Sequence, residues 1–188
     1  MVGRRRESGI AIVFEACGTT TDAERWIEPG WGEARLSSAG RRQAKELGKR
    51  RADDEIDAVF CSDLPQAVDT ARIAFAERGL PIFLDWRLRG CDYGTLSGTA
   101  VAPIEAARAE HVYDPYPGGE SYGDVVGRVR RFLQDVPRGL VDGRIVVVGH
   151  PETKWALDHV LEGIPLPELV ERAFHWQPGW LYTLHVDV

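Results

Sequence analysis

The sequence predicts an α/β fold, a three-layer α/β/α sandwich around a mostly parallel central sheet. Short apolar runs alternate with helical patterns along the chain, as in proteins whose parallel strands are joined by helices. The run at 144–149 holds three consecutive valines, which is typical of a strand buried on both faces. Because 188 residues suit one domain with a sizeable core, we expect a single domain over 1–188.

The first half of the chain alternates strand and helix signals. In order, we expect a strand at 10–14, a polar loop at 18–35, a helix at 38–51, a strand at 56–61, a helix at 66–77 and a strand at 81–84. Ser37 offers an N-cap for the first helix. Pro65 suits the first turn of the second helix, and Gly79 suits its end.

The second half begins with a long irregular stretch. In order, we expect this stretch at 86–119 with a helix around 103–110, then a helix at 120–136, a strand at 144–149, a helix at 152–161 and a strand at 180–186. Val125, Val129 and Phe132 recur at helical spacing. Loops this long usually serve a site, so we predict that 86–119 is an insertion covering the strand ends, where open α/β sheets bind ligands.

Composition excludes several classes of function. A net charge of -6 gives no basic surplus for nucleic acid. No apolar run approaches the roughly 18 residues of a membrane span. The basic run Arg4 to Arg6 precedes no apolar segment of a signal peptide. Three cysteines without a CxxC pair indicate free thiols. We therefore expect a cytoplasmic protein, and the sequence leaves its oligomeric state open.

Six local patterns follow one another in a recognisable order. They are ACGTT at 16–20, LSSAGRRQA at 36–44, CSDLPQAVDTA at 61–71, LRGCDYGTLSG at 88–98, PGGES at 117–121 and VVVGH at 146–150. Each pattern is weak alone, but together they span nearly the whole chain. In this order and spacing, the sequence resembles the histidine phosphatase superfamily, in its phosphoglycerate-mutase-like branch.

The resemblance implies a specific chemistry. Members carry Arg-His-Gly after the first strand, and the His attacks phosphorus to form phosphohistidine. An Asn, a second Arg and a second His complete the phosphate pocket, and a Glu in the middle insertion protonates the leaving oxygen. A neutral imidazole is a good nucleophile near neutral pH, and two arginines neutralise the phosphoryl oxygens through bidentate hydrogen bonds.

This sequence departs from that pattern at the positions that carry the chemistry. The family's first Arg, nucleophilic His, Asn, second Arg and Glu fall on Ala16, Cys17, Ala23, Gln66 and Gly90. Gly18 and His150 remain. Removal of one preorganised donor to a transition-state oxyanion commonly costs about 10²–10³ in rate. We therefore do not expect ordinary phosphatase or mutase activity.

The remaining side chains predict a different site. A neighbouring His can lower the pKa of a Cys, so Cys17 beside His150 predicts a thiolate nucleophile, with Glu15 or Asp92 as acid or base. We expect substrate contacts from Gly18, Thr19, Asp22, Gln66, Gly90 and Arg89. The competing interpretation of Cys17 is a small apolar residue that fills space. Cys17, Cys91 and His150 lack a known ligand spacing, so we expect no metal and no cofactor.

Three functions stay open at this point. The first is a repurposed enzyme that acts on a small metabolite through Cys17 and His150. The alternative is an inactive pseudo-phosphatase that binds a small-molecule ligand or a partner protein. The second alternative is a residual phosphatase acting on a small phosphorylated metabolite.

Overall fold

The central sheet of the protein is mostly parallel. A computed structural model describes residues 8–136, 140 and 143–186. In this part of the chain the main sheet has the strand order β4-β3-β6-β1-β7. Its strands are β1 (Ser8–Ala16), β3 (Ala58–Cys61), β4 (Ile82–Leu84), β6 (Arg144–Gly149) and β7 (Trp180–Val186). β7 alone among them runs antiparallel, against β1. The predicted strands and the mostly parallel sheet are confirmed.

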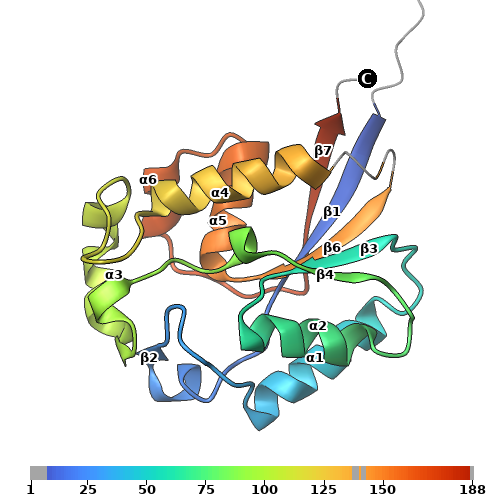
Figure 1. The fold of residues 1–188 in the computed structure, drawn as a ribbon, viewed down its shortest axis with the longest axis horizontal. Helices are drawn as coiled ribbons and strands as arrows, with labels where there is room; N and C mark the ends of the chain where they lie inside the picture. Colours follow the sequence, from blue (N-terminus) through green and yellow to red (C-terminus); the bar gives the residue numbers. More distant parts are fainter. Residues whose placement is uncertain (1–7, 137–139, 141–142, 187–188) are drawn as a thin grey trace, which may run out of the picture.

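Helices cover both faces of the sheet (Figure 1). On one face lie α1 (Ser38–Arg50) and α2 (Pro65–Phe75). On the other lie α4 (Tyr122–Asp135), α5 (Pro151–Leu161) and α6 (Leu166–Glu171). The three-layer prediction is therefore confirmed, and α6 is a short helix that it missed. As predicted, Ser37 caps α1, accepting the N–H of Gly40 at 3.1 Å, and Pro65 lies in the first turn of α2.

Two apolar cores separate the layers, because successive strand residues point to opposite faces. Val13, Val59 and Val146 pack under α1 and α2. Phe14 and Val147 pack with the residues of α4 and α5. The strands are thus buried on both faces, as their nearly continuous apolar sequence indicated.

The long loops add small elements, most of them beyond the end of the sheet and to the left in Figure 1. They are η1 (Ala23–Arg25), β2 (Ile27–Glu28), η2 (Trp86–Leu88), η3 (Gly94–Leu96), β5 (Thr99–Ala100), α3 (Val101–Ala107) and η4 (Arg108–His111). β2 and β5 pair in a two-stranded antiparallel ribbon that the sequence analysis did not predict. The helix predicted around 103–110 is divided between α3 and η4.

The strand register brings the candidate residues together. Ala16 at the end of β1 pairs with Gly149 at the end of β6, so the next residues, Cys17 and His150, leave the sheet side by side. The Cys17 backbone N–H donates to the Gly149 carbonyl at 2.9 Å. In the described residues, no helix combines the length and the apolar character needed to cross a membrane.

Candidate functional site

A hollow of about 420 Å³ opens where β1 and β6 end. The loops around residues 20–30 and 90–108 form its outer wall. Its lining includes Cys17, Gly18, Thr19, Glu28, Gln43, Gln66, Gly90, Tyr93, Arg108, His150 and Glu152, with Trp26, Phe174 and Trp176 as further aromatic residues. The hollow therefore unites several of the predicted site residues: Cys17, Gly18, Thr19, Gln66, Gly90 and His150.

Cys17 and His150 face one another, with the Sγ atom 3.8 Å from Nδ1. Burial, followed by the negative charges of Glu152 and Glu28, raises the pKa of the Cys17 thiol to about 12. Burial, reinforced by the positive charge of Arg128, lowers the pKa of His150 to about 3. Both shifts favour the neutral forms near pH 7, so the predicted thiolate at Cys17 is not supported by its surroundings and stays a prediction.

Three side chains of this hollow have buried polar atoms without a partner: Oε1 of Gln66, Nε2 of His150 and Nε of Arg108. Gln66 and His150 are only 4% and 7% exposed. A buried polar group without a hydrogen bond costs roughly 1–3 kcal/mol, so the pair is suited to a ligand that supplies the missing bonds.

The backbone N–H groups after β1 are already engaged. The N–H of Gly18 donates to Thr70 Oγ1 at 2.9 Å, and the N–H of Thr19 donates to Gln43 Oε1 at 2.8 Å. A Cβ at Gly18 would lie 2.6 Å from the carbonyl oxygen of Gly40, so glycine is required there for packing against α1. The loop therefore presents no free pair of N–H donors for an anion.

Two acidic side chains that were not predicted, Glu28 and Glu152, line the outer wall. Glu152 Oε1 accepts the hydroxyl of Tyr93 at 2.7 Å. Burial, followed by repulsion from Glu152, raises the pKa of Glu28 to about 7, against the opposing effects of the Gly30 N–H and of Arg108. Glu152 could have been predicted as a site residue from the sequence, because it follows His150 by two residues in the first turn of α5. Glu28 could not have been predicted, because only the β2–β5 pairing brings it to the hollow.

Gly90 is a narrow point of the hollow. A Cβ added there would lie 3.0 Å from Glu152 Oε2 and 3.3 Å from the Cβ and Cγ of His150. The Glu152 carboxylate and the His150 ring therefore border one small space. The Gly90 carbonyl accepts from Trp31 Nε1 at 2.9 Å and from the buried Arg128 at 2.7 Å, which fixes this segment.

Four predicted site residues do not line the hollow. Glu15 instead forms ion pairs with Arg50 at 3.0 Å and Arg51 at 2.7 Å, because its buried carboxylate needs compensating charge. The Asp92 carboxylate accepts the N–H of Gly94 at 2.9 Å and so shapes its own turn. Their predicted roles as acid or base are not supported by this placement.

Asp22 and Arg89 are the other two. The Asp22 carbonyl accepts the N–H groups of Arg25 and Ile27, so this residue organises a turn in the loop. The Arg89 guanidinium makes two bonds to the Asp63 carboxylate, at 2.6 and 2.7 Å, and lies 4.6 Å from the centre of the Trp31 ring. Both residues are used by the scaffold rather than by the hollow.

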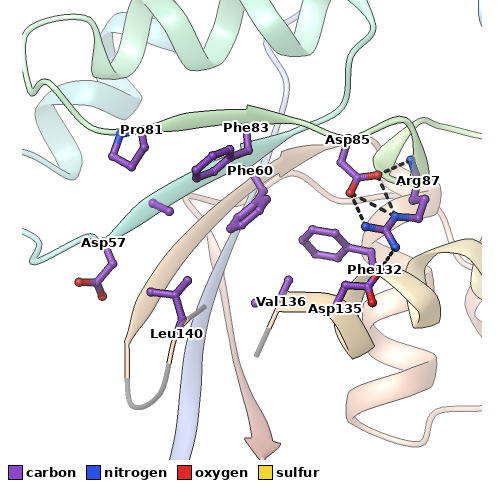
Figure 2. A pocket seen from close by; sticks show the side chains of 11 residues that line it. Asp57, Phe60, Pro81, Phe83, Asp85, Arg87, Phe132, Asp135, Val136 and Leu140 are labelled. Atoms are coloured by element: carbon purple, nitrogen blue, oxygen red, sulfur yellow. Dashed lines mark hydrogen bonds and ion pairs between the residues drawn. The ribbon is translucent and has the colours of Figure 1, made fainter. Parts of the chain in front are cut away.

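A second hollow of about 430 Å³ lies beside β3 and β4 (Figure 2). Its aromatic wall includes Phe60, Phe83 and Phe132. Its Arg87 is bonded to Asp85 at 2.7 Å and to Asp135 at 2.6 Å, as Figure 2 shows. In the described residues, the buried polar atoms without a hydrogen-bond partner all lie outside this second hollow. Unlike the hollow that contains Gln66 and His150, it therefore has no buried polar atom that a ligand would satisfy.

Within the same residues, no group of three or more His, Cys, Asp and Glu is placed to hold a metal ion.

Comparison with known proteins identifies the family to which the chain belongs. The family model for the histidine phosphatase superfamily (branch 1) matches residues 18–187. The chain belongs to the histidine phosphatase superfamily. This member is 31% identical over 173 residues to a 2,3-bisphosphoglycerate-dependent phosphoglycerate mutase of Bradyrhizobium sp. strain BTAi1, covering 84% of each chain.

Solved structures of superfamily members have the same fold as this chain. Bacillus stearothermophilus YhfR superposes with a TM-score of 0.82 at 26% identity, covering 95% of this chain and 92% of that one. A mycobacterial glucosyl-3-phosphoglycerate phosphatase in complex with VO3 superposes with a TM-score of 0.77 at 27% identity, covering 85% of each chain. This superfamily member is thus homologous to phosphoglycerate mutases and to phosphatases of small phosphorylated metabolites.

Proposed function

We propose that this chain is a non-catalytic, ligand-binding member of the histidine phosphatase superfamily. Its hollow takes a small molecule that is not a phosphate ester. In this proposal, the segment 86–119 is an insertion that covers the ligand, since Gly90, Tyr93 and Arg108 all line the hollow.

The residues at the family's chemical positions support this proposal. Ala16 and Gln66 stand where the resemblance places arginines, and both line the hollow. Cys17 stands at the position of the nucleophilic His, and Gly90 at the position of the proton-donating Glu. Phosphohistidine cannot form at a cysteine, and no side chain at these positions supplies the charge that a phosphoryl group requires.

The observation that carries the proposal is the charge of the hollow. At its base, Cys17 and His150 are neutral near pH 7, because burial raises the pKa of the first and lowers the pKa of the second. Its outer wall holds the carboxyl groups of Glu28 and Glu152. Arg108 is the cation among the lining residues; one of its terminal nitrogens pairs with Glu105 at 3.1 Å, and its Nε has no partner. A dianionic phosphate would therefore be repelled rather than bound.

Phosphate binding and turnover test this proposal directly. We expect no hydrolysis of p-nitrophenyl phosphate above that of the His150→Ala variant. We also expect no rise in Tm with inorganic phosphate or vanadate, since a ligand stabilises the folded state only if it binds it. Hydrolysis that disappears in His150→Ala would instead establish the residual phosphatase, the reading that kinship with phosphatases of small phosphorylated metabolites favours.

A second candidate is a repurposed enzyme that acts through Cys17 and His150. The 3.8 Å separation of Sγ and Nδ1 favours it. Iodoacetamide separates the two functions, because only the thiolate reacts. We expect alkylation of Cys17 at pH 8 to be at least ~10-fold slower than that of an unperturbed thiol with a pKa near 8.5, with the urea-unfolded chain as the reference. Rapid, His150-dependent labelling at pH 7 would support the enzyme.

A further inference from the structure

We propose that the hollow binds a small organic cation of single charge that also carries a hydroxyl group, as an amino alcohol does. This inference rests on the proposed function, because a phosphatase would hold an anion in the same place. It identifies the ligand by the two chemically different ends of the hollow: an acidic wall and an uncharged polar base.

The acidic wall sets the charge of the ligand. Glu28 and Glu152 line the hollow together with Arg108. Burial and Glu152 raise the pKa of Glu28 to about 7, so above that pH two carboxylates face one guanidinium and leave one negative charge in excess. The Glu28 carboxylate accepts the backbone N–H of Gly30 at 3.1 Å, and that of Glu152 accepts the Tyr93 hydroxyl at 2.7 Å. Neither bond brings a positive charge, so a monovalent ammonium group supplies what the wall lacks.

The base of the hollow sets the second group of the ligand. Gln66 Oε1 can only accept a hydrogen bond. If the Cys17 thiol donates to His150 Nδ1 across their 3.8 Å contact, Nε2 of the neutral ring carries the proton and donates. The base then offers one acceptor and one donor, both buried and without a partner. A hydroxyl group both donates and accepts, so it matches this pair.

The two ends are close enough for one short ligand. Glu152 Oε2 and the His150 ring both pack closely against Gly90, since a Cβ there would lie 3.0 Å from the first and 3.3 Å from the second, so the acidic wall and the polar base meet at this residue. Trp26 and Trp176 also line the hollow and are largely exposed. Tryptophan faces attract organic cations, so these rings suit the ammonium end of such a ligand.

Three probes of equal length and different charge test the inference. They are 4-amino-1-butanol, 1,4-butanediol and 4-hydroxybutyrate, which share the hydroxyl and carry a positive, no and a negative charge. Binding is followed by NMR through the side-chain amide signal of Gln66, assigned with the Gln66→Leu variant. We expect millimolar affinity from so small a probe, and a Kd for the amino alcohol at least ~10-fold below that of the diol.

Matched variants separate the acidic wall from general acidity. Glu28→Gln should bring the Kd of 4-amino-1-butanol up to that of the diol. Glu33→Gln should leave it unchanged, because Glu33 is exposed and does not line the hollow. Equal affinity of amino alcohol and diol, or no shift of the Gln66 signal with the amino alcohol, overturns the inference while the proposed function stands. Preference for 4-hydroxybutyrate overturns the inference alone, and preference for inorganic phosphate overturns both.

Discussion

At the residue scale, burial shifts the pKa values of Cys17 and His150 toward their neutral forms. The imidazole of His150 and the thiol of Cys17 lie 3.8 Å apart, a contact that often yields a thiolate and an imidazolium. Here the same burial acts on both groups in the direction of neutrality, and Arg128 adds a positive charge near the imidazole. In the proposed function, the pair therefore serves as a hydrogen-bonding surface rather than as a nucleophile.

The Glu28 carboxyl gives a pH-dependent prediction. Its pKa in the folded protein is about 7, raised by burial and by Glu152 from the usual 4.5. Between these values the folded protein retains a proton that the unfolded chain has lost. The stability that Glu28 contributes is therefore present below pH 4.5 and is lost as the pH rises through 7, at no more than about 1.4 kcal/mol per pH unit.

The measurement is urea unfolding at a series of pH values for the wild type and Glu28→Gln. We expect the wild type to lose about 3 kcal/mol relative to the variant between pH 4.5 and 8. His150 works in the opposite direction, since its pKa falls to about 3 in the folded state, but it does so equally in both proteins. The exposed Glu33→Gln is the control and should follow the wild type. A constant difference between wild type and Glu28→Gln would contradict the prediction.

Part of this site could be read from single residues, and part could not. Cys17, Gln66 and His150 were predictable because each directly follows a strand or begins a helix beside one, and parallel strands end at one edge. Glu15 failed because alternation along β1 turns its side chain toward Arg50 and Arg51, away from the hollow. Arg89 failed because its partner, Asp63, is distant in sequence.

At the element scale, α4 supports the floor of the site through one buried side chain. The Arg128 guanidinium donates to the carbonyls of Arg87, Arg89 and Gly90, each at 2.7 Å, and forms an ion pair with Glu120 at 2.9 Å. It thereby holds the segment that contains Gly90 in place. Ser121 caps α4, and the preceding residue, Glu120, pairs with Arg128.

Replacement of Arg128 tests this support. Arg128→Met leaves the Glu120 carboxylate and the three carbonyls without their donor in a buried place. We expect a loss of about 3–5 kcal/mol in the free energy of unfolding, measured by urea denaturation. Arg130→Met on the same helix is the matched control, since Arg130 is exposed, and it should change stability by less than about 0.5 kcal/mol. Equal denaturation midpoints for the two variants would show that Arg128 has no such role.

The elements themselves divide into those with a periodic signal and those without. β1, β3 and β6 are apolar runs, and α4 repeats Val125, Val129 and Phe132 at helical spacing, so tertiary packing and local pattern agree. The β2–β5 ribbon has two residues on each strand. Elements this short have no period to detect, and they form only because the loops meet above the sheet.

At the scale of the whole molecule, the scaffold is that of the superfamily, and the proposed function assigns a different chemistry to its pocket. The TM-score of 0.82 to Bacillus stearothermophilus YhfR extends over 95% of the chain. The strand ends that carry Cys17 and His150 are held by backbone pairing, which does not depend on the side chains at the site. Side chains that bind phosphate can therefore be placed on this framework by substitution.

The proposed function predicts that anion binding can be restored by charge alone. The triple variant Ala16→Arg, Cys17→His and Gln66→Arg places two guanidinium groups and an imidazole around the base of the hollow, where Ala16, Cys17 and Gln66 now lie. Each charge-assisted hydrogen bond contributes roughly 1.5–3 kcal/mol. We therefore expect the triple variant to bind vanadate at least ~10-fold more tightly than Cys17→His alone, measured by calorimetry.

The control for this experiment is the wild type, which should bind no vanadate. Thermal unfolding shows whether the triple variant keeps its fold, and Ala16→Gln with Gln66→Lys offers a less bulky pair if it does not. Adding Glu28→Gln should tighten vanadate binding further, because it removes a carboxylate from the wall. Vanadate binding by the wild type as tight as that by the triple variant would mean that the hollow already accepts anions. The acidic wall would then have to be offset by Arg108, whose Nε is buried without a partner.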